Sequence, residues 1–213
     1  DALPISRQAN TPPSLTKYNS SPTNSGEGIV ITEKIDGTNI RIVLTANGRE
    51  FRGRSDEASI PPFLLRALEK TDGLSSAALL SHFGSNALEG QDGDGPAPEV
   101  VLYGEGCGER IQKVGWMYGE PKFILFDVRV GKTWLRRDSV ADVGKDLGLP
   151  VAHSLGEMTL HAAIELVRRG VMSAYAAHLA EGVIARPKHE LLDRMGRRLI
   201  VKIKHRDFLN ATA

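Results

Sequence analysis

The chain has 213 residues, of which 41% are hydrophobic and 25% are charged, and its formal net charge at pH 7 is +1. This composition predicts a soluble globular protein of one domain, in which any nucleic-acid contact must come from a local basic patch. No apolar run approaches the ~20 residues that cross a bilayer, and the start of the chain lacks the pattern of a secretory signal. The single Cys107 cannot form an internal disulfide, which favours a cytoplasmic setting without membrane contact.

The N-terminal part leads from a polar segment into two short strands. Residues 1–28 are rich in Ser, Asn, Thr and Pro, so we expect an extended segment there. Apolar residues in 29–35 and 40–44 predict strands that are separated by a turn at Asp36-Gly37. Lys34 lies where the first strand meets this turn, a position suited to a nucleophile. An attacking lysine needs cations, a metal or a dry pocket nearby to lower its pKa.

A hairpin is predicted next. Asn47-Gly48 is a hairpin turn signal between strands at 40–45 and 49–53. We expect this hairpin to return Arg52 and Arg54 toward the lysine, on one face of their strand. One of the two arginines is a candidate phosphate ligand, and the alternative is an ordinary exposed strand edge.

Helices are predicted at 61–69 and 75–83, followed by an acidic Gly/Pro surface loop at 84–98. Two buried strands follow, at 99–106 and 123–130, and both carry polar candidates. Glu105 lies between glycines that let a ligand approach the backbone, and Phe126 stands beside Asp127. A flat ring at the edge of a pocket suits a purine base, although Phe126 is equally compatible with the core.

The C-terminal part predicts covering helices and two strands. The helices are expected at 139–147 and 160–169 and the strands at 181–186 and 199–204. Lys202 and Lys204 alternate with apolar residues, so both amines project to one side of their strand. Paired lysines of this kind hold phosphates and supply the positive charge that a nucleophilic lysine requires.

The order of these motifs resembles that of the covalent-lysine nucleotidyltransferases, the superfamily of polynucleotide ligases and capping enzymes. The motifs are Glu33-Lys34-Ile35-Asp36-Gly37-Thr38-Asn39, Tyr103-Gly104-Glu105-Gly106, Phe126-Asp127, Glu181-Gly182-Val183-Ile184 and Val201-Lys202-Ile203-Lys204. Each motif alone is weak, whereas five in order across residues 29–208 are specific. The resemblance implies an α+β fold, with antiparallel sheets around an ATP pocket and helices outside, and a nucleotidyltransferase domain at 29–213.

Within the superfamily, the chain is most similar to the RNA ligases related to the double-strand-sealing phage enzyme. Three features carry this similarity: Glu33 before the lysine, Thr38-Asn39 after the glycine, and the stretch Gly108-Glu109-Arg110-Ile111-Gln112-Lys113. DNA ligases and capping enzymes usually have an arginine where Asn39 stands. Asp36 departs from the phage enzymes, which carry histidine there, and so weakens a claim to the same substrate preference.

The resemblance assigns roles to individual residues. Lys34 would attack the α-phosphate of ATP and carry AMP before it passes to a 5′-phosphate end and a 3′-hydroxyl seals the strand. Glu33 and Phe126 would hold adenine, while Arg54 and Glu105 would bind ribose and phosphate. Other roles also follow by similarity: α-phosphate neutralisation by Lys202 and Lys204, binding of Mg²⁺ or Mn²⁺ by Glu181, orientation of the metal's waters by Asn39, and an unassigned role for Asp127.

The implied partner is nucleic acid with 5′-phosphate and 3′-hydroxyl ends, in particular a nicked duplex that contains RNA, and a monomer is expected. Many relatives carry an additional domain, so this chain is either a minimal enzyme or an excised catalytic domain. An excised domain should still become adenylylated but seal poorly.

Alternative functions remain open at this point. They are a DNA ligase, a capping-type guanylyltransferase and a non-catalytic nucleic-acid-binding module of the same fold, whereas a kinase is disfavoured because no Gly-rich phosphate loop opens a helix. The six histidines lack the spacing of a zinc site. Arg194, Arg197 and Arg198 surround an expected hairpin tip and are the first candidates for a contact with the nucleic-acid backbone.

Overall fold

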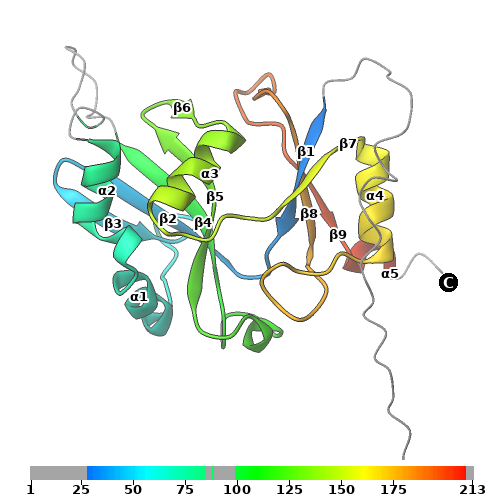
Figure 1. The fold of residues 1–213 in the computed structure, drawn as a ribbon, viewed down its shortest axis with the longest axis horizontal. Coiled ribbons are helices and arrows are strands. Elements are labelled where there is room, and N and C mark those ends of the chain that lie inside the picture. Colours follow the sequence, from blue (N-terminus) through cyan, green and yellow to red (C-terminus); the bar gives the residue numbers. More distant parts are fainter. Residues whose placement is uncertain (1–27, 85–87, 89–98, 210–213) are drawn as a thin grey trace, which may run out of the picture.

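The computed structural model describes residues 28–84, 88 and 99–209. Two antiparallel sheets form its framework, sheet A in the order β7-β1-β8-β9 and sheet B in the order β3-β2-β4-β5-β6 (Figure 1). The strands are β1 (Ile29–Lys34), β2 (Thr38–Thr45), β3 (Gly48–Arg52), β4 (Val100–Cys107), β5 (Lys122–Val130), β6 (Thr133–Trp134), β7 (Ser154–Met158), β8 (Gly182–Pro187) and β9 (Val201–Lys204). The helices are α1 (Pro62–Glu69), η2 (Asp72–Leu74), α2 (Ser76–Phe83), η4 (Gly115–Tyr118), α3 (Arg137–Asp146), α4 (Leu160–Arg169) and α5 (Arg206–Leu209).

The mixed architecture with antiparallel sheets and flanking helices confirms the expected fold class. The expected N-terminal segment falls outside the described residues except for Gly28, as does most of the acidic loop at 84–98. The predicted hairpin is present, since Thr45 pairs with Gly48. Among the described helices, none is long and apolar enough to cross a membrane.

The turn at Asp36-Gly37 connects the two sheets. Strand β1 pairs with β7 and β8 in sheet A, whereas β2 pairs with β3 and β4 in sheet B. The two strands around the turn are therefore sequence neighbours that do not pair with each other. Lys34, at the end of β1, thus lies at the junction of the sheets.

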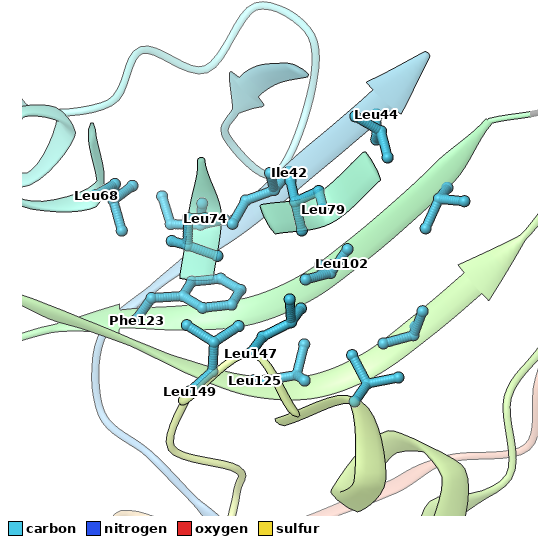
Figure 2. Close-up of a cluster of buried hydrophobic side chains, with 14 of the residues drawn as sticks. Ile42, Leu44, Leu68, Leu74, Leu79, Leu102, Phe123, Leu125, Leu147 and Leu149 are labelled. Carbon is cyan, nitrogen blue, oxygen red and sulfur yellow. The ribbon is translucent and has the colours of Figure 1, made fainter. Parts of the chain in front are cut away.

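Helices cover the outer faces of both sheets and form two hydrophobic cores. In sheet B, apolar residues of β2, β4 and β5 pack against α1, α2 and α3, and Figure 2 shows Ile42, Leu79 and Leu102 within this cluster. In sheet A, Ile31 and Val183 pack with Val167 of α4. The apolar side of each strand faces one of these cores. Alternation therefore leaves the polar residues on the opposite faces, which border a cleft between the two sheets.

A β-bulge in β5 places two consecutive side chains on the cleft side. Tyr103 of β4 pairs with Asp127, while the next residue, Gly104, pairs with Leu125, so Phe126 is the extra residue. Leu125 and Val128 both reach the core of sheet B, which leaves Phe126 and Asp127 together on the opposite side. Bulges commonly re-aim side chains beside active sites in this way.

Two strands of the structure, β6 and β7, were not predicted from the sequence. Strand β7 has the sequence SLGEM, which lacks apolar alternation, and it is held by pairing with β1. The two-residue β6 exists only through its pairing with β5. The last two strands begin one or two residues later than expected, so Glu181 lies just before β8.

Candidate active site

The cleft between the sheets contains most of the predicted site residues. Its volume is about 180 Å³. The predicted residues that line it are Glu33, Lys34, Asn39, Glu105, Phe126, Asp127 and Lys202. Sheet A contributes Lys34 and Lys202, and sheet B contributes Asn39, which pairs with Glu105 across β2 and β4. Four parts of the chain, at residues 33–39, 105, 126–127 and 202, therefore meet at one place.

One carboxylate joins two of the predicted lysines. Glu181 accepts hydrogen bonds from the Lys34 amine and from Lys204, whose Nζ lies 2.8 Å from Glu181 Oε1. Although burial disfavours its charged form, the hydrogen bonds from Lys204 and Lys34 lower the pKa of Glu181. This carboxylate thus carries a negative charge at neutral pH, directly beside the candidate nucleophile.

Two further carboxyl groups lie close to this pair. Burial raises the pKa of Glu105 to about 7, against the opposing effect of the Lys34 charge and with a smaller contribution from Glu181. Burial and the charge of Glu181 also raise the pKa of Asp36. Because burial is the main cause of both shifts, the two carboxyl groups share a poorly solvated environment beside Glu181 and Lys34.

The turn that follows Lys34 is fixed by residues from the segment after β4. The Asp36 backbone N–H donates to the Tyr118 hydroxyl at 3.2 Å, and Gln112 Nε2 donates to the Gly37 carbonyl oxygen at 2.8 Å. A methyl group on Gly37 would lie 2.4 Å from the Gly106 carbonyl oxygen, so the turn needs glycine for close approach to β4.

Asp127 connects the two sheets through arginines. Its Oδ1 lies 2.7 Å from Arg186 of β8, and its Oδ2 lies 2.9 Å from Arg198. Arg198 also pairs with Glu190 and lies 4.0 Å from the centre of the Trp134 ring. The exposed fraction of the Asp127 side chain is only 6%, so this ion pair is buried and bridges sheets B and A.

Glu33 borders the cleft, but its carboxylate contacts another segment. Alternation sends its side chain to the opposite face of β1 from Lys34. There the carboxylate accepts hydrogen bonds from the Ser173 hydroxyl and from the Ala174 backbone N–H at 2.9 Å. The predicted contact with adenine remains a prediction for this residue.

The arginines after the first hairpin do not reach the cleft as expected. The expectation that Arg52 and Arg54 share one strand face is wrong, because β3 ends at Arg52 and Arg54 follows as an exposed residue. Arg52 pairs with Glu50 on the surface. Neither arginine is among the residues that line the cleft.

The basic run near the C-terminus is a turn, as predicted, but its arginines differ in environment. The Gly196 N–H donates to the Asp193 carbonyl oxygen, and Leu192 forms an isolated antiparallel β-bridge with Arg198. Arg197 is exposed and pairs with Asp193, whereas Arg198 is largely buried in the ion pairs with Asp127 and Glu190. Arg198 is therefore already paired inside the protein, and the predicted contact of this run with a nucleic-acid backbone stays a prediction.

Two arginines near the cleft were missed by the sequence analysis. Arg186 lines the cleft two residues after Ile184, and strand alternation from Ile184 was a signal that could have found it. Arg137 donates hydrogen bonds to the carbonyl oxygens of Phe126, at 2.9 Å, and Ala152. No local pattern marks Arg137, because both acceptors are brought to it by the tertiary fold.

The remaining predictions concern metal-binding and thiol groups. Among the described residues, no group of three or more His, Cys, Asp or Glu side chains could hold a metal by itself. Cys107 is fully buried in a small apolar cluster that includes Ile35 and Ile124, and burial raises its pKa to about 12. Cys107 therefore fills an apolar space in this cluster.

The fold is that of solved RNA ligases of the nucleotidyltransferase type. A Naegleria gruberi RNA ligase with PPi has a TM-score of 0.62 and 16% identity, and the match covers 89% of this chain and 52% of that chain. A lysine-to-alanine mutant of the Naegleria ligase with ATP and Mn has a TM-score of 0.60 and 17% identity over 88% and 52% of the two chains. An archaeal ATP-dependent RNA ligase has a TM-score of 0.58 and 18% identity over 84% and 43%.

The sequence supports the same assignment. A family model of RNA ligases matches residues 27–204, and the chain belongs to this family. No curated protein sequence matches the chain. The chain spans about half the length of the solved ligases that it matches.

Proposed function

We propose that this chain catalyses the ATP-dependent joining of RNA ends, through an AMP group carried on Lys34. The observation that carries the proposal is the position of Lys34 at the junction of the sheets, in a cleft that also holds Phe126, Glu105 and Lys202. Membership of the RNA ligase family supports the reaction class. The likeness to ligases solved with ATP and Mn supports the nucleotide.

The first step would be a displacement at phosphorus. The unprotonated amine of Lys34 attacks the α-phosphorus of ATP, an N–P bond forms, the bond to the bridging oxygen breaks, pyrophosphate leaves, and the nitrogen releases one proton to solvent. Lys202 and Lys204 project from β9 toward the same end and neutralise the α-phosphate. Catalysis of such a step depends on positioning and charge.

The nucleotide would lie along the cleft. We propose that the adenine packs on Phe126 and that the ribose hydroxyls bond to Glu105. The proposed nucleotide contact of Arg54 would require this exposed residue to approach when ATP binds. Asn39 stands opposite Glu105 and is placed to bond the phosphates or their waters.

The donor set fits a divalent cation that is shared with the nucleotide. Mg²⁺ and Mn²⁺ prefer oxygen ligands, and Mg²⁺ usually takes only one or two carboxylates together with waters and phosphates. Glu181 would hold the ion, and the carboxyl groups of Asp36 and Glu105 lie nearby. A bound ion of this kind stabilises the developing charge on the phosphates.

The later steps transfer AMP from Lys34 to a 5′-phosphate, and a 3′-hydroxyl then attacks that 5′-phosphate so that a phosphodiester bond forms and AMP leaves. We propose a nicked duplex that contains RNA as the preferred substrate, a monomeric protein in the cytoplasm, and a catalytic domain formed by residues 29–213. The family match from residue 27 to 204 supports these domain limits.

Mass spectrometry after incubation with ATP and Mg²⁺ or Mn²⁺ tests the proposal. One added adenylate on Lys34 is expected, and Lys34→Ala should abolish it, whereas Lys113→Ala serves as a control. Labelled GTP in place of ATP identifies a guanylyltransferase, and sealing of DNA nicks alone identifies a DNA ligase. Absence of a covalent adenylate on protein that binds ATP would refute the proposal and favour a non-catalytic binding module.

A further inference from the structure

A second hollow continues the cleft beyond the proposed base site. It has a volume of about 110 Å³, far more than the roughly 10–15 Å³ that one water molecule requires. Thr32, Asp127 and Arg186 line both hollows, so the two adjoin. A shallower depression shares Val30 and Lys188 with the second hollow and extends it to the surface.

The second hollow is rich in cations. The hollow is lined by five basic side chains, those of Arg136, Arg137, Arg186, Lys188 and Arg198. Asp127 and Glu190 already pair with Arg186 and Arg198, so Arg136, Arg137 and Lys188 are the cations that a ligand would meet. The start of α3 lies in the same wall, where a helix N-terminus favours negative charge. The neighbouring base site, in contrast, is lined by Phe126, Ile184 and Ile200.

Two of these arginines retain hydrogen-bonding capacity. The Nε of Arg186 is buried and has no hydrogen-bond partner among the described residues. Arg137 is bonded to two backbone carbonyls and, within the described part of the chain, is paired with no carboxylate. Among the described residues, the wall of the second hollow therefore contains one arginine without a carboxylate partner and one buried donor that is unsatisfied.

The cations at the rim are held weakly. Arg136 pairs with Asp138 and Lys188 pairs with Glu157, and all four side chains are exposed, between 47% and 79%. Exposed pairs contribute about 0–1 kcal/mol, so a more highly charged ligand can displace them. A phosphate group accepts charge-assisted hydrogen bonds from several arginines at once.

The spacing from the nucleophile suits a polynucleotide. Val30 and Lys34 lie on the same face of β1, four residues apart, which corresponds to ~13 Å along a strand. A group bound in the second hollow is therefore outside the position of the α-phosphate at Lys34, but within reach of a strand of a few nucleotides. We propose that the second hollow binds a backbone phosphate of the RNA substrate, an inference that rests on the proposed function.

The test compares two double variants that each remove two exposed cations. Arg136→Ala with Lys188→Ala alters the rim of the second hollow, whereas Arg66→Ala with Lys70→Ala alters α1 on the outer side of sheet B. Binding of a 5′-phosphorylated RNA oligonucleotide, labelled at its 3′ end, is measured by fluorescence anisotropy over a range of salt concentrations without ATP. Adenylylation of Lys34 is measured separately without RNA.

The rim variant should bind RNA about tenfold more weakly, and its slope of log K against log salt should fall by about 0.7 for each lost phosphate contact. The α1 variant should lose less than about twofold, and both variants should form the Lys34 adenylate at the wild-type level. Equal RNA affinities for the two variants overturn the inference. If the rim variant binds inorganic phosphate more weakly than the wild type but binds RNA equally well, the inference is also overturned, because the hollow would then be a site for a free anion.

The two proposals fail in different measurements. Wild-type protein that binds RNA through the rim cations but forms no adenylate contradicts the proposed function alone. If the wild-type protein forms the adenylate and the Arg136→Ala, Lys188→Ala variant binds RNA as tightly as the wild type, this inference alone is contradicted. Thermal unfolding of both variants verifies that each is folded before the affinities are compared.

Discussion

The buried ion pair at Asp127 provides a quantitative prediction about stability. We consider Asp127→Asn, which keeps the shape of the side chain and removes its charge. The carboxylate contacts Arg186 at 2.7 Å and Arg198 at 2.9 Å, with side-chain exposures of 15% and 12% for the two arginines. Arg198 retains Glu190 in the variant, whereas Arg186 loses its only carboxylate among the described residues.

The expected loss of stability follows from this difference. Removing one partner of a buried ion pair costs about 3–5 kcal/mol because the other charge stays buried without a partner. Since only Arg186 is left unpaired, we expect the lower end, about 3 kcal/mol. For a chain of this size, the melting temperature changes by about 2–4 °C per kcal/mol, so it should fall by roughly 6–12 °C.

Urea unfolding gives the free-energy difference, and thermal unfolding gives the shift in melting temperature. Asp142→Asn, at an exposed position of α3, is the control and should change the free energy of unfolding by less than about 0.5 kcal/mol. Adding Arg186→Met to Asp127→Asn should recover part of the loss, because the unpaired charge is removed. A loss below about 1 kcal/mol for Asp127→Asn would refute the argument.

Further predictions concern a carboxyl group, a glycine and a thiol. Burial raises the pKa of Glu105 from 4.5 to about 7, so between these two pH values the native state holds a proton that the unfolded chain has released. The free energy of unfolding, measured in urea, should therefore fall by roughly 3 kcal/mol as the pH rises through this range. Glu105→Gln should remove this slope, and a persistent slope would contradict the assignment. Gly37→Ala would place its Cβ 2.4 Å from the Gly106 carbonyl oxygen, so it should destabilise the protein by about 1–3 kcal/mol and slow adenylylation. An unchanged adenylylation rate would count against a role of this turn in placing Lys34. Cys107, fully buried and with its pKa raised to about 12, should react with a thiol reagent only in urea, and rapid labelling of native protein would disprove its burial.

The position of the nucleophile shows how much of the site is local. Lys34 ends a strand and precedes a turn, and both features depend on neighbouring residues that the sequence displays. The alternation of Lys202 and Lys204 on β9 is local in the same sense, and β9 pairs with β8 so that Lys204 lies opposite Gly182. Each candidate residue is therefore predictable from its own motif, whereas the cleft that brings the candidates together is a feature of the tertiary structure.

Other parts of the site depend on register and on long-range pairing. Simple alternation would place only one of Phe126 and Asp127 on the cleft side, and the bulge against Tyr103 and Gly104 places both there. The burial of Arg198 likewise depends on Asp127, which lies 71 residues away in sequence. Neither feature has a signature within its own segment.

The sequence by itself determined the order of motifs, the strands that carry them and the identity of the lysine, because side-chain periodicity and turn chemistry act between near neighbours. Only the tertiary structure decided that β1 and β2 belong to different sheets, that the Glu33 carboxylate bonds to the segment at Ser173, and that a basic hollow continues the cleft. These features arise from which strands pair and in what register, and that choice is made by burial and charge pairing over the whole chain.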